Sequence, residues 1–504
     1  MTNNHKNKYI ELFKKTHGVA EWATVRLNKL KERLAPWAIK DRYYNKKEYC
    51  KKDKYDHRTK FQHDISRIIH SKAFRRLKHK TQVFISYEKD HYRTRLTHVM
   101  EVFQLATNIA RTLGLDEDLA GAIALGHDLG HTPFGHAGES SLNNIMEGKC
   151  EELLTFFNSE DKEEIIRTLE LRKHKLGFGF QHNFQSIKVL KNEERDITPE
   201  TREGILKHTN WLKFIRNSCT NNKLYASNNP EYYLKDVSLD LVSHLEGQVV
   251  AICDEIAQRC HDLDDGIRSN LICIDNKDFK NLVNKLKRNA KISHASYVKR
   301  FTGAYSDSLK RKDNDPAEYL PDFIDSLFHL LVSNLLERSI KSIKKAINTN
   351  KHINSASFTK KIGYSEIDSI TVKHDEHVHE FQKELKEILK IKIYHSSPSI
   401  VREERAKYFI LNLFKAYLKN PLSLPDKTLL TYFKKNNLPN KKTKSKLFEL
   451  RKMTTNKAEI ESVKYRKDVR FWETICDHIS GMTDDYAQDR FERFYAPFKM
   501  VTKD

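Results

Sequence analysis

The chain has 504 residues, more than one hydrophobic core usually serves, so we expect two or three packed lobes. Glycine (16) and proline (11) are scarce, a composition that favours an all-α fold over β-sandwiches and glycine-rich dinucleotide-binding units. The sequence contains no apolar run of transmembrane length, no signal-peptide core and no CxxC pair among its seven cysteines. The expected location is therefore the reducing cytoplasm, with no membrane partner and no zinc ribbon.

The charge of the chain is strongly positive. Its formal net charge is +22, from 90 Lys and Arg against 68 Asp and Glu. Such a field attracts polyanions, either nucleic acid or phosphorylated small molecules; the alternative is a lysine-rich surface whose charges are only solvated. The densest basic runs, Asn45–Lys60 and Asn440–Lys446, lack the interleaved aromatic residues of a base-stacking surface. They predict loose electrostatic binding at most.

Helical periodicity covers most of the chain. Residues 1–55 are expected to form a helical N-terminal lead-in, residues 56–300 a helical core, and residues 301–504 a helical C-terminal region. Apolar segments such as Leu327–Ile343 and Tyr408–Leu418 predict helices within the last region. We see no tandem repeat and no low-complexity linker.

Two predicted helices carry a polar residue on an apolar face. One is expected over Leu96–Leu113, because Gly114 is a good residue just past a helix end, and His98 lies on its apolar stripe. Another is expected over Leu241–Asp265, with Asp254 on the buried side. Polar groups carried into a core are costly unless something binds them.

The string GHDLGHTPFGHAGE, at residues 126–139, is the richest in chemistry. A helix is predicted over Leu119–His131 and ended by Pro133, which would place His127 and His131 four residues apart on one face. Small residues on this helix permit close contact with neighbouring helices. Asp128 lies on the next strip around the helix. The apolar run Leu119–Leu125 leads into the string, so the string starts inside a packed element.

Four inward-facing groups on these three helices form a candidate metal site: His98, His127, Asp128 and Asp254. Two imidazoles and two carboxylates suit one divalent ion such as Mn, Fe, Ni, Mg or Zn. Open positions would remain for water and a phosphate oxygen. The alternative is that each residue is a satisfied core or capping residue, but the adjacent His-Asp pair with small flanking residues favours the metal.

The pattern H…HD…D resembles the HD-domain metal-dependent phosphohydrolases, and its flanks resemble the deoxyguanosine triphosphate triphosphohydrolases, most closely the longer bacterial forms. The flanking motifs span about residue 60 to 490 and are HDISRIIHSKAFRRLKHKTQVF, TRLTHVMEV, GHDLGHTPFGHAGE, TREGILKH, CDEIAQRCHDLDD and ISGMTDDYA. The resemblance implies an HD helical core, a C-terminal region that completes the nucleotide pocket, and one divalent metal per site, with Mn, Mg, Fe, Ni or Co as candidates.

The resemblance also implies roles at the phosphate. The metal would bind an α-phosphate oxygen, while His136 acts as general acid to the leaving 5′-oxygen or as base for the attacking water, and Glu139 orients its imidazole and raises its pKa. His131 matches another phosphate-side histidine, or a residue that supports the site by hydrogen bonding only. Arg95 matches an arginine that contacts phosphate and base.

Further residues match less closely. Lys207 and His182 would contact phosphate or serve as surface residues; His182 stands where relatives commonly have glycine. Gln82 and Asp262 match residues that hydrogen-bond the sugar 3′-hydroxyl. Relatives usually carry a tyrosine under the deoxyribose at the position of Gln258. A glutamine can bond a hydroxyl, which puts strict deoxyribose selection in doubt.

The expected activity is hydrolysis of dNTPs, dGTP favoured, to deoxynucleoside and triphosphate by water attack on the α-phosphorus. One alternative is another HD phosphohydrolase, such as a nucleotidase or a hydrolase of nucleotide second messengers. A second is a protein that mainly binds single-stranded nucleic acid through its charge. The resemblance further implies a homo-oligomer, often a hexamer, and a single-stranded DNA effector.

Overall fold

The computed structural model describes residues 34–35, 38–39, 58–82, 94–176, 178–209, 244–289, 294–349, 372–435, 440–453, 457 and 464–496. Within these ranges the chain is helical, and the β pairing present is one isolated bridge between Thr81 and Thr94. The predicted all-α fold is confirmed. The basic run Asn45–Lys60 and the N-terminal lead-in lie almost wholly outside the described residues.

The helices in chain order have the following bounds: α3 (Lys60–Ile69), α4 (Lys72–Arg76), α5 (Arg95–Leu113), α6 (Glu117–Gly126), α7 (Gly135–Met146), α8 (Glu151–Leu154), α9 (Ser159–Leu176), α10 (His182–Asn192), α11 (Pro199–Lys207), α13 (Leu245–Arg268), α14 (Lys277–Arg288), α16 (Ser296–Lys310), α17 (Leu320–Thr349), α20 (Glu376–Leu389), α21 (Ser397–Lys419), α22 (Asp426–Lys435), α23 (Asn440–Lys452), α25 (Val469–Ser480) and α26 (Asp484–Tyr495). Short turns of tighter or wider helix are η1 (Leu77–His79), η4 (Pro316–Glu318), η5 (Lys390–Tyr394) and η6 (Pro421–Ser423).

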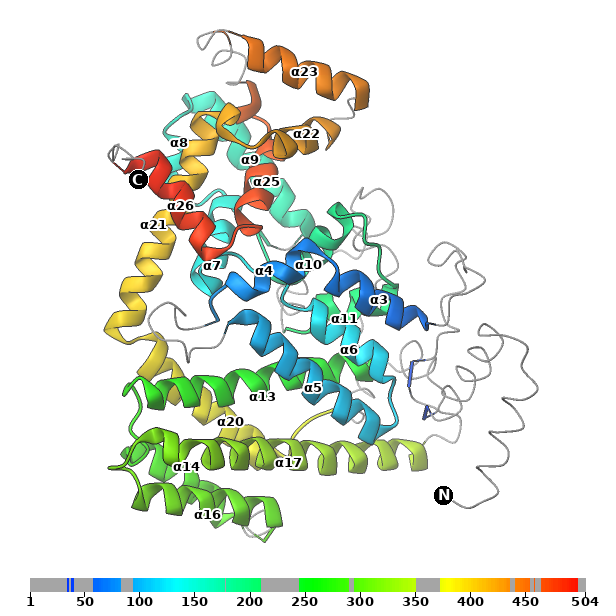
Figure 1. Cartoon of the computed structure of the whole chain (residues 1–504), viewed down its shortest axis with the longest axis vertical. Helices are drawn as coiled ribbons and strands as arrows, with labels where there is room; N and C mark the ends of the chain where they lie inside the picture. Colours follow the sequence, from blue (N-terminus) through cyan, green and yellow to red (C-terminus); the bar gives the residue numbers. More distant parts are fainter. Residues whose placement is uncertain are drawn as a thin grey trace, which may run out of the picture.

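Buried apolar side chains fall into two clusters. The first joins α3, α5, α6, α10, α11 and the helices from α13 to α20, and the second joins α7, α8 and α9 to α21, α22, α23, α25 and α26. Figure 1 shows the second set above the first, with α21 running down the left side of the second set toward the first. The division at residues 55 and 300 remains a prediction.

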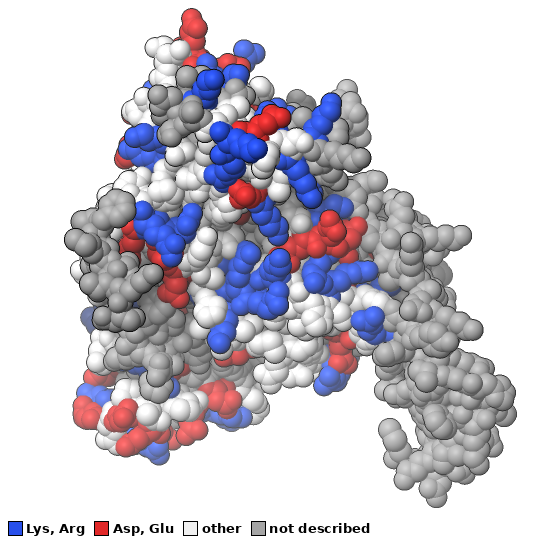
Figure 2. Space-filling model, turned by 45° about the horizontal axis from the view of Figure 1, so that its top comes forward, with Lys and Arg blue, Asp and Glu red and all other residues white. Residues whose placement is uncertain are grey.

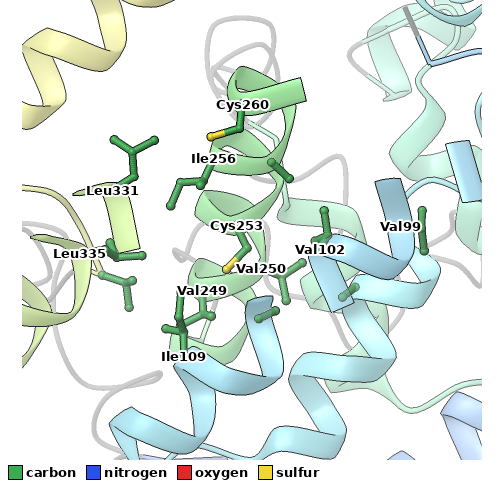
Figure 3. Close-up of a cluster of buried hydrophobic side chains, with 14 of the residues drawn as sticks. Val99, Val102, Ile109, Val249, Val250, Cys253, Ile256, Cys260, Leu331 and Leu335 are labelled. Carbon is green, nitrogen blue, oxygen red and sulfur yellow. The ribbon is translucent and has the colours of Figure 1, made fainter. Parts of the chain in front are cut away.

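Helix α13 occupies the middle of the first cluster. Figure 3 shows its apolar side chains, among them Val250 and Cys253, between α5 on one side and α17 on the other. Both residues are fully buried. This packing carries Asp254, the next residue along the helix, to the side where α5 presents His98.

The predicted helix over residues 96–113 is confirmed as α5. Thr94 caps its N-terminus by accepting a hydrogen bond from the N–H of Thr97, and Gly114 ends it with a left-handed φ of 72°. Such a φ is adopted by glycine at little cost, which is why the sequence located this end closely. The segments Leu327–Ile343 and Tyr408–Leu418 are likewise helical, in α17 and α21.

The predicted helix over Leu119–His131 is wrong at its C-terminal end. Helix α6 stops at Gly126, and His127 is its C-cap. Ser186 of α10 takes part in this ending, because its hydroxyl accepts a hydrogen bond from the N–H of Gly130 at 2.8 Å and lies 2.9 Å from the carbonyl oxygen of His127. His127 and His131 therefore do not share a helical face.

Positive and negative side chains are interspersed on the surface (Figure 2). On the face drawn in Figure 2, Lys and Arg gather in several separate groups with Asp and Glu between them. This distribution favours diffuse attraction of anions over one continuous basic track. None of the described helices is both long and apolar enough to cross a bilayer.

Candidate metal centre and active site

The four residues of the candidate metal site meet in the structure. His98 Nε2 lies 2.9 Å from Asp254 Oδ1. His127 Nε2 lies 3.4 Å from Asp128 Oδ1 and 3.7 Å from Asp254 Oδ1. The side chains of His98, His127 and Asp128 are buried, whereas that of Asp254 is 19% exposed. Nitrogen and oxygen atoms from three separate helical segments therefore converge on one small volume.

The orientation of His127 suits a cation. Its Nδ1 lies 2.7 Å from the carbonyl oxygen of Ala124 and donates to it, so Nε2 is the nitrogen left to take a proton or to bind a cation. Nε2 is buried and has no hydrogen-bond partner among the described residues, although it faces two carboxylates. Burial opposes a charged His127, yet Asp128 and Asp254 raise its pKa to about 9. Positive charge is therefore favoured at Nε2, and a divalent ion fits these donors.

Asp128 has two further partners, Arg95 and His131. Arg95 Nη1 lies 2.6 Å from its Oδ2, and His131 Nδ1 lies 3.1 Å from its Oδ1. Burial raises the pKa of Asp128, but the charges of His127 and Arg95, together with the contact from His131, outweigh it and hold the pKa well below its ordinary value. Burial and Arg95 lower the pKa of His131, so this imidazole is neutral.

A second constellation begins one turn further along the chain, on α7. Glu139 Oε1 accepts hydrogen bonds from the backbone N–H of His182 at 2.9 Å and lies 2.8 Å from His182 Nδ1. Glu139 Oε2 lies 3.6 Å from Nδ1 of His136, whose side chain is 64% exposed. The carboxylate of Glu139 raises the pKa of His136 through this contact. His136 is therefore an accessible imidazole with a stabilised protonated form.

The two constellations are joined by a run of histidine rings. The rings of His131 and His182 lie 3.8 Å apart between centroids and are tilted by 36°. The ring of His208 lies 5.3 Å from that of His182 and 5.0 Å from that of His127. Burial and the histidines at 127 and 182 lower the pKa of His208 to about 3, so it stays neutral. His182, predicted as a phosphate or surface residue, is buried between Glu139 and His208.

The loop between α6 and α7 depends on glycines. A Cβ on Gly130 would lie 2.3 Å from both the carbonyl oxygen of His182 and the N–H nitrogen of Ser186. Gly135 has φ of 59°, and Phe134 before it has φ of 63°, which a non-glycine residue adopts only at a cost. The close approach of α10 and the left-handed turn together set the separation between the metal site and His136.

The residues predicted to bind the sugar lie in two groups. Asp262 Oδ2 accepts a hydrogen bond from Tyr394 Oη at 2.7 Å, and Gln258 Nε2 lies 3.5 Å from the same Oη. Burial raises the pKa of Asp262 to about 6. Gln82 lies apart from these residues, beside the loop between α6 and α7. Its backbone carbonyl oxygen is 3.5 Å from where a Cβ on Gly135 would be. Gln82 Oε1 is buried without a hydrogen-bond partner within the described part of the chain.

Lys207, predicted as a phosphate or surface residue, is buried on α11. Its Nζ lies 2.7 Å from Glu203 Oε1. Its surface alternative is therefore excluded by its burial, and its contact with phosphate remains a prediction.

Sequence reasoning missed several residues around the site. His208 is the last residue of the motif TREGILKH, so the sequence offered a reason to place it near the site. No motif in the sequence around Tyr394 pointed to the site. Lys80 is buried and donates to the carbonyl oxygen of His131 and, at 3.0 Å, to that of Ser480. Its pKa is lowered to about 7 by burial and by Arg95.

Comparison with known proteins decides the family. The HD domain matches residues 95–258, which include both constellations up to Asp254. A deoxyguanosinetriphosphate triphosphohydrolase-like protein of Bartonella tribocorum is 33% identical over 87% of this chain and 90% of its own length. The chain belongs to the deoxyguanosinetriphosphate triphosphohydrolase-like family. Proteins of the same description from Geobacter metallireducens and Rickettsia prowazekii are each 30% identical over 88% of this chain, and over 91% and 93% of their own lengths.

Membership of this dGTPase-like family confirms the resemblance drawn from the motifs. It supports a metal-dependent phosphohydrolase acting on a nucleotide, with a divalent metal held by His and Asp side chains. The clusters suited to a metal among the described residues include His98, His127 and Asp128, whose ligand atoms lie within 4.8 Å of one another. A second cluster joins His131, His136 and Glu139.

Proposed function

We propose that this chain hydrolyses dNTPs, with dGTP favoured, to deoxynucleoside and inorganic triphosphate. The observation that carries the proposal is the juxtaposition of a His-Asp metal site with an exposed, carboxylate-backed imidazole, His136, on the next helix. The first group suits a phosphate oxygen, and the second suits a proton transfer beside it.

His98, His127, Asp128 and Asp254 would hold one divalent ion, with Mn, Mg, Fe, Ni and Co as candidates. The bound ion supplies Lewis acidity toward an α-phosphate oxygen. Arg95, buried and bonded to Asp128, orients that carboxylate and offers guanidinium donors toward phosphate. Lys207 and His182 stay proposed phosphate-side residues; His182 also fixes Glu139.

In the proposed reaction, water attacks the α-phosphorus, the bond from phosphorus to the 5′-oxygen breaks, and the proton of the attacking water passes to solvent. The leaving 5′-oxygen takes a proton from His136, whose pKa Glu139 raises. This shift favours the general-acid role of His136 over the role of base for the attacking water. His131, a neutral imidazole in contact with Asp128, would support the phosphate side by hydrogen bonding.

Selection of the sugar would depend on Gln82, Gln258 and Asp262. Tyr394 supports this proposal, because its hydroxyl donates to Asp262 and lies near the amide of Gln258. Oxygen and amide groups at one place suit recognition of a sugar hydroxyl.

Incubation of the purified protein with each dNTP and each rNTP, in Mn or Mg, tests the proposal by chromatography of the products. Deoxynucleoside plus triphosphate supports it. Deoxynucleoside diphosphate plus orthophosphate, or turnover of a nucleoside monophosphate or a nucleotide second messenger alone, favours another HD phosphohydrolase.

We further propose a single-stranded DNA effector, which the net charge of +22 supports, and a homo-oligomer of this chain, which rests on the family resemblance alone. Binding to single-stranded DNA with a steep loss of affinity as salt rises, together with altered dNTP turnover, would support the effector. The same binding in a protein that hydrolyses no nucleotide would favour a nucleic-acid-binding role. Light scattering of the purified chain tests the oligomer, for which a hexamer is the expected state.

A further inference from the structure

Asp484, the first residue of α26, reaches from the C-terminal part of the chain into the loop that precedes α7. It is only 3% exposed. Its Oδ1 accepts a hydrogen bond from the backbone N–H of Phe134 at 2.9 Å. Its Oδ2 accepts from the backbone N–H of Thr81 at 2.8 Å and from the Thr81 hydroxyl. One buried carboxylate thus ties two segments that lie far from it in the sequence.

Phe134 is the N-cap of α7 and has a left-handed backbone with φ of 63°. A residue with a Cβ adopts this conformation at a cost and keeps it only when its surroundings hold it. The cap has no side-chain hydrogen bond of its own. The contact with Asp484 is therefore a specific interaction that favours the strained turn.

The turn determines where α7 begins, and α7 carries both His136 and Glu139. His136 follows Phe134 by two residues, so a change in the Phe134 backbone moves its imidazole directly. Neighbouring contacts reinforce the same junction: Arg76 Nη1 donates to the carbonyl oxygen of Gly481 at 2.8 Å. The segment 480–484 therefore contacts both the segment 76–81 and the loop before α7.

We propose that Asp484 is a positioning residue for the His136–Glu139 pair, acting by holding the Phe134 N–H in the left-handed turn. The inference rests on the proposed function for the roles of His136 and Glu139. It goes beyond that function by giving the C-terminal motif ISGMTDDYA a defined task in the reaction.

The test compares Asp484→Ala with Asp485→Asn, a matched control that removes a carboxylate from the exposed neighbouring residue. Asp484→Ala is expected to lower kcat for the preferred dNTP by roughly 100-fold, the effect of a small misplacement, with KM nearly unchanged. Asp485→Asn should leave both unchanged. Asp484→Asn serves if the alanine variant does not fold, since it replaces one of the two accepting oxygens by an NH2 group, which cannot accept from a backbone N–H.

Rescue distinguishes positioning from a general structural role. Phe134→Gly removes the cost of the left-handed backbone, so the kcat loss caused by Asp484→Ala should be at least about tenfold smaller in that background. An equal loss in both backgrounds, or a lower melting temperature with wild-type kcat, would overturn the proposal.

A readout without substrate separates this inference from the proposed function. Hydrogen exchange of the peptide covering residues 130–142 should be faster in Asp484→Ala than in wild type and unchanged in Asp485→Asn. Absence of dNTP hydrolysis in the wild type would refute the proposed function, whereas wild-type exchange in Asp484→Ala would refute the positioning by Asp484.

Discussion

His127 Nε2 and Asp254 Oδ1 face each other at 3.7 Å, one at the end of α6 and the other inside α13. His127 is held in this direction by the Ala124 carbonyl oxygen, and Asp254 also contacts His98. The metal site therefore exists only because these separate helices pack against one another.

His127→Ala and Asp128→Ala are each expected to remove bound metal and to lower turnover by more than about 100-fold, a loss larger than that of residues which only support metal ligands. Metal content by elemental analysis and turnover by chromatography check both effects. His70→Ala, at an exposed histidine just past α3, is the control and should change neither. Full metal content with full activity in Asp128→Ala would remove these residues from the site.

The pH dependence of the reaction is expected to report His136. Because Glu139 raises the pKa of His136, its acid form persists above its ordinary range and is lost as pH rises through the raised pKa. Activity should fall along that alkaline limb. Glu139→Gln lowers the pKa of His136, so the limb should move to lower pH, with kcat reduced by about 10²–10⁴-fold.

The measurement is kcat/KM against pH for wild type and Glu139→Gln. A limb that stays in place would show that His136 is not the titrating acid. Movement of an acid limb instead would assign His136 as the base for the attacking water.

Gln258→Tyr is expected to increase the preference for dNTP over rNTP, because a rigid ring under the sugar leaves less room for a 2′-hydroxyl. Competition between dGTP and GTP measures the ratio of kcat/KM values. Tyr394→Phe is the companion variant: it removes the donor to Asp262 without adding bulk at Gln258. An unchanged ratio in Gln258→Tyr would show that Gln258 does not select the sugar.

Gly130→Ala is expected to destabilise the protein by about 1–3 kcal/mol, as overpacking does, because the new Cβ would meet backbone atoms of His182 and Ser186 that cannot move cheaply. Thermal unfolding checks this. Gly303→Ala is the matched control: at this exposed position of α16 a Cβ meets nothing within 4 Å, so stability should rise by about 0.5–1 kcal/mol. Equal melting temperatures for the two variants would contradict the close contact between the loop and α10.

Local signals accounted for much of what the sequence predicted correctly. Thr94 and Gly114 delimit α5 through capping chemistry that depends on a few neighbouring residues. Periodicity placed His98 on the buried side of its helix, whereas Asp254, also predicted there, is partly exposed. The pair His136 and Glu139 is three residues apart on one helix. These features depend on backbone geometry within a few turns, which the sequence alone determines.

Tertiary structure decided the rest, because it depends on contacts between distant segments. Helix α6 ends at Gly126, five residues before its predicted end, where Ser186 bonds the following loop, and no periodicity within residues 119–131 reveals that partner. Tyr394 contacts Asp262 across a separation of 132 residues, and Asp484 contacts Phe134 across a separation of 350 residues. The sequence by itself determined the all-α class and the helical faces that carry the chemistry. The packing of two hydrophobic clusters around one loop decided how far apart the metal site and His136 lie.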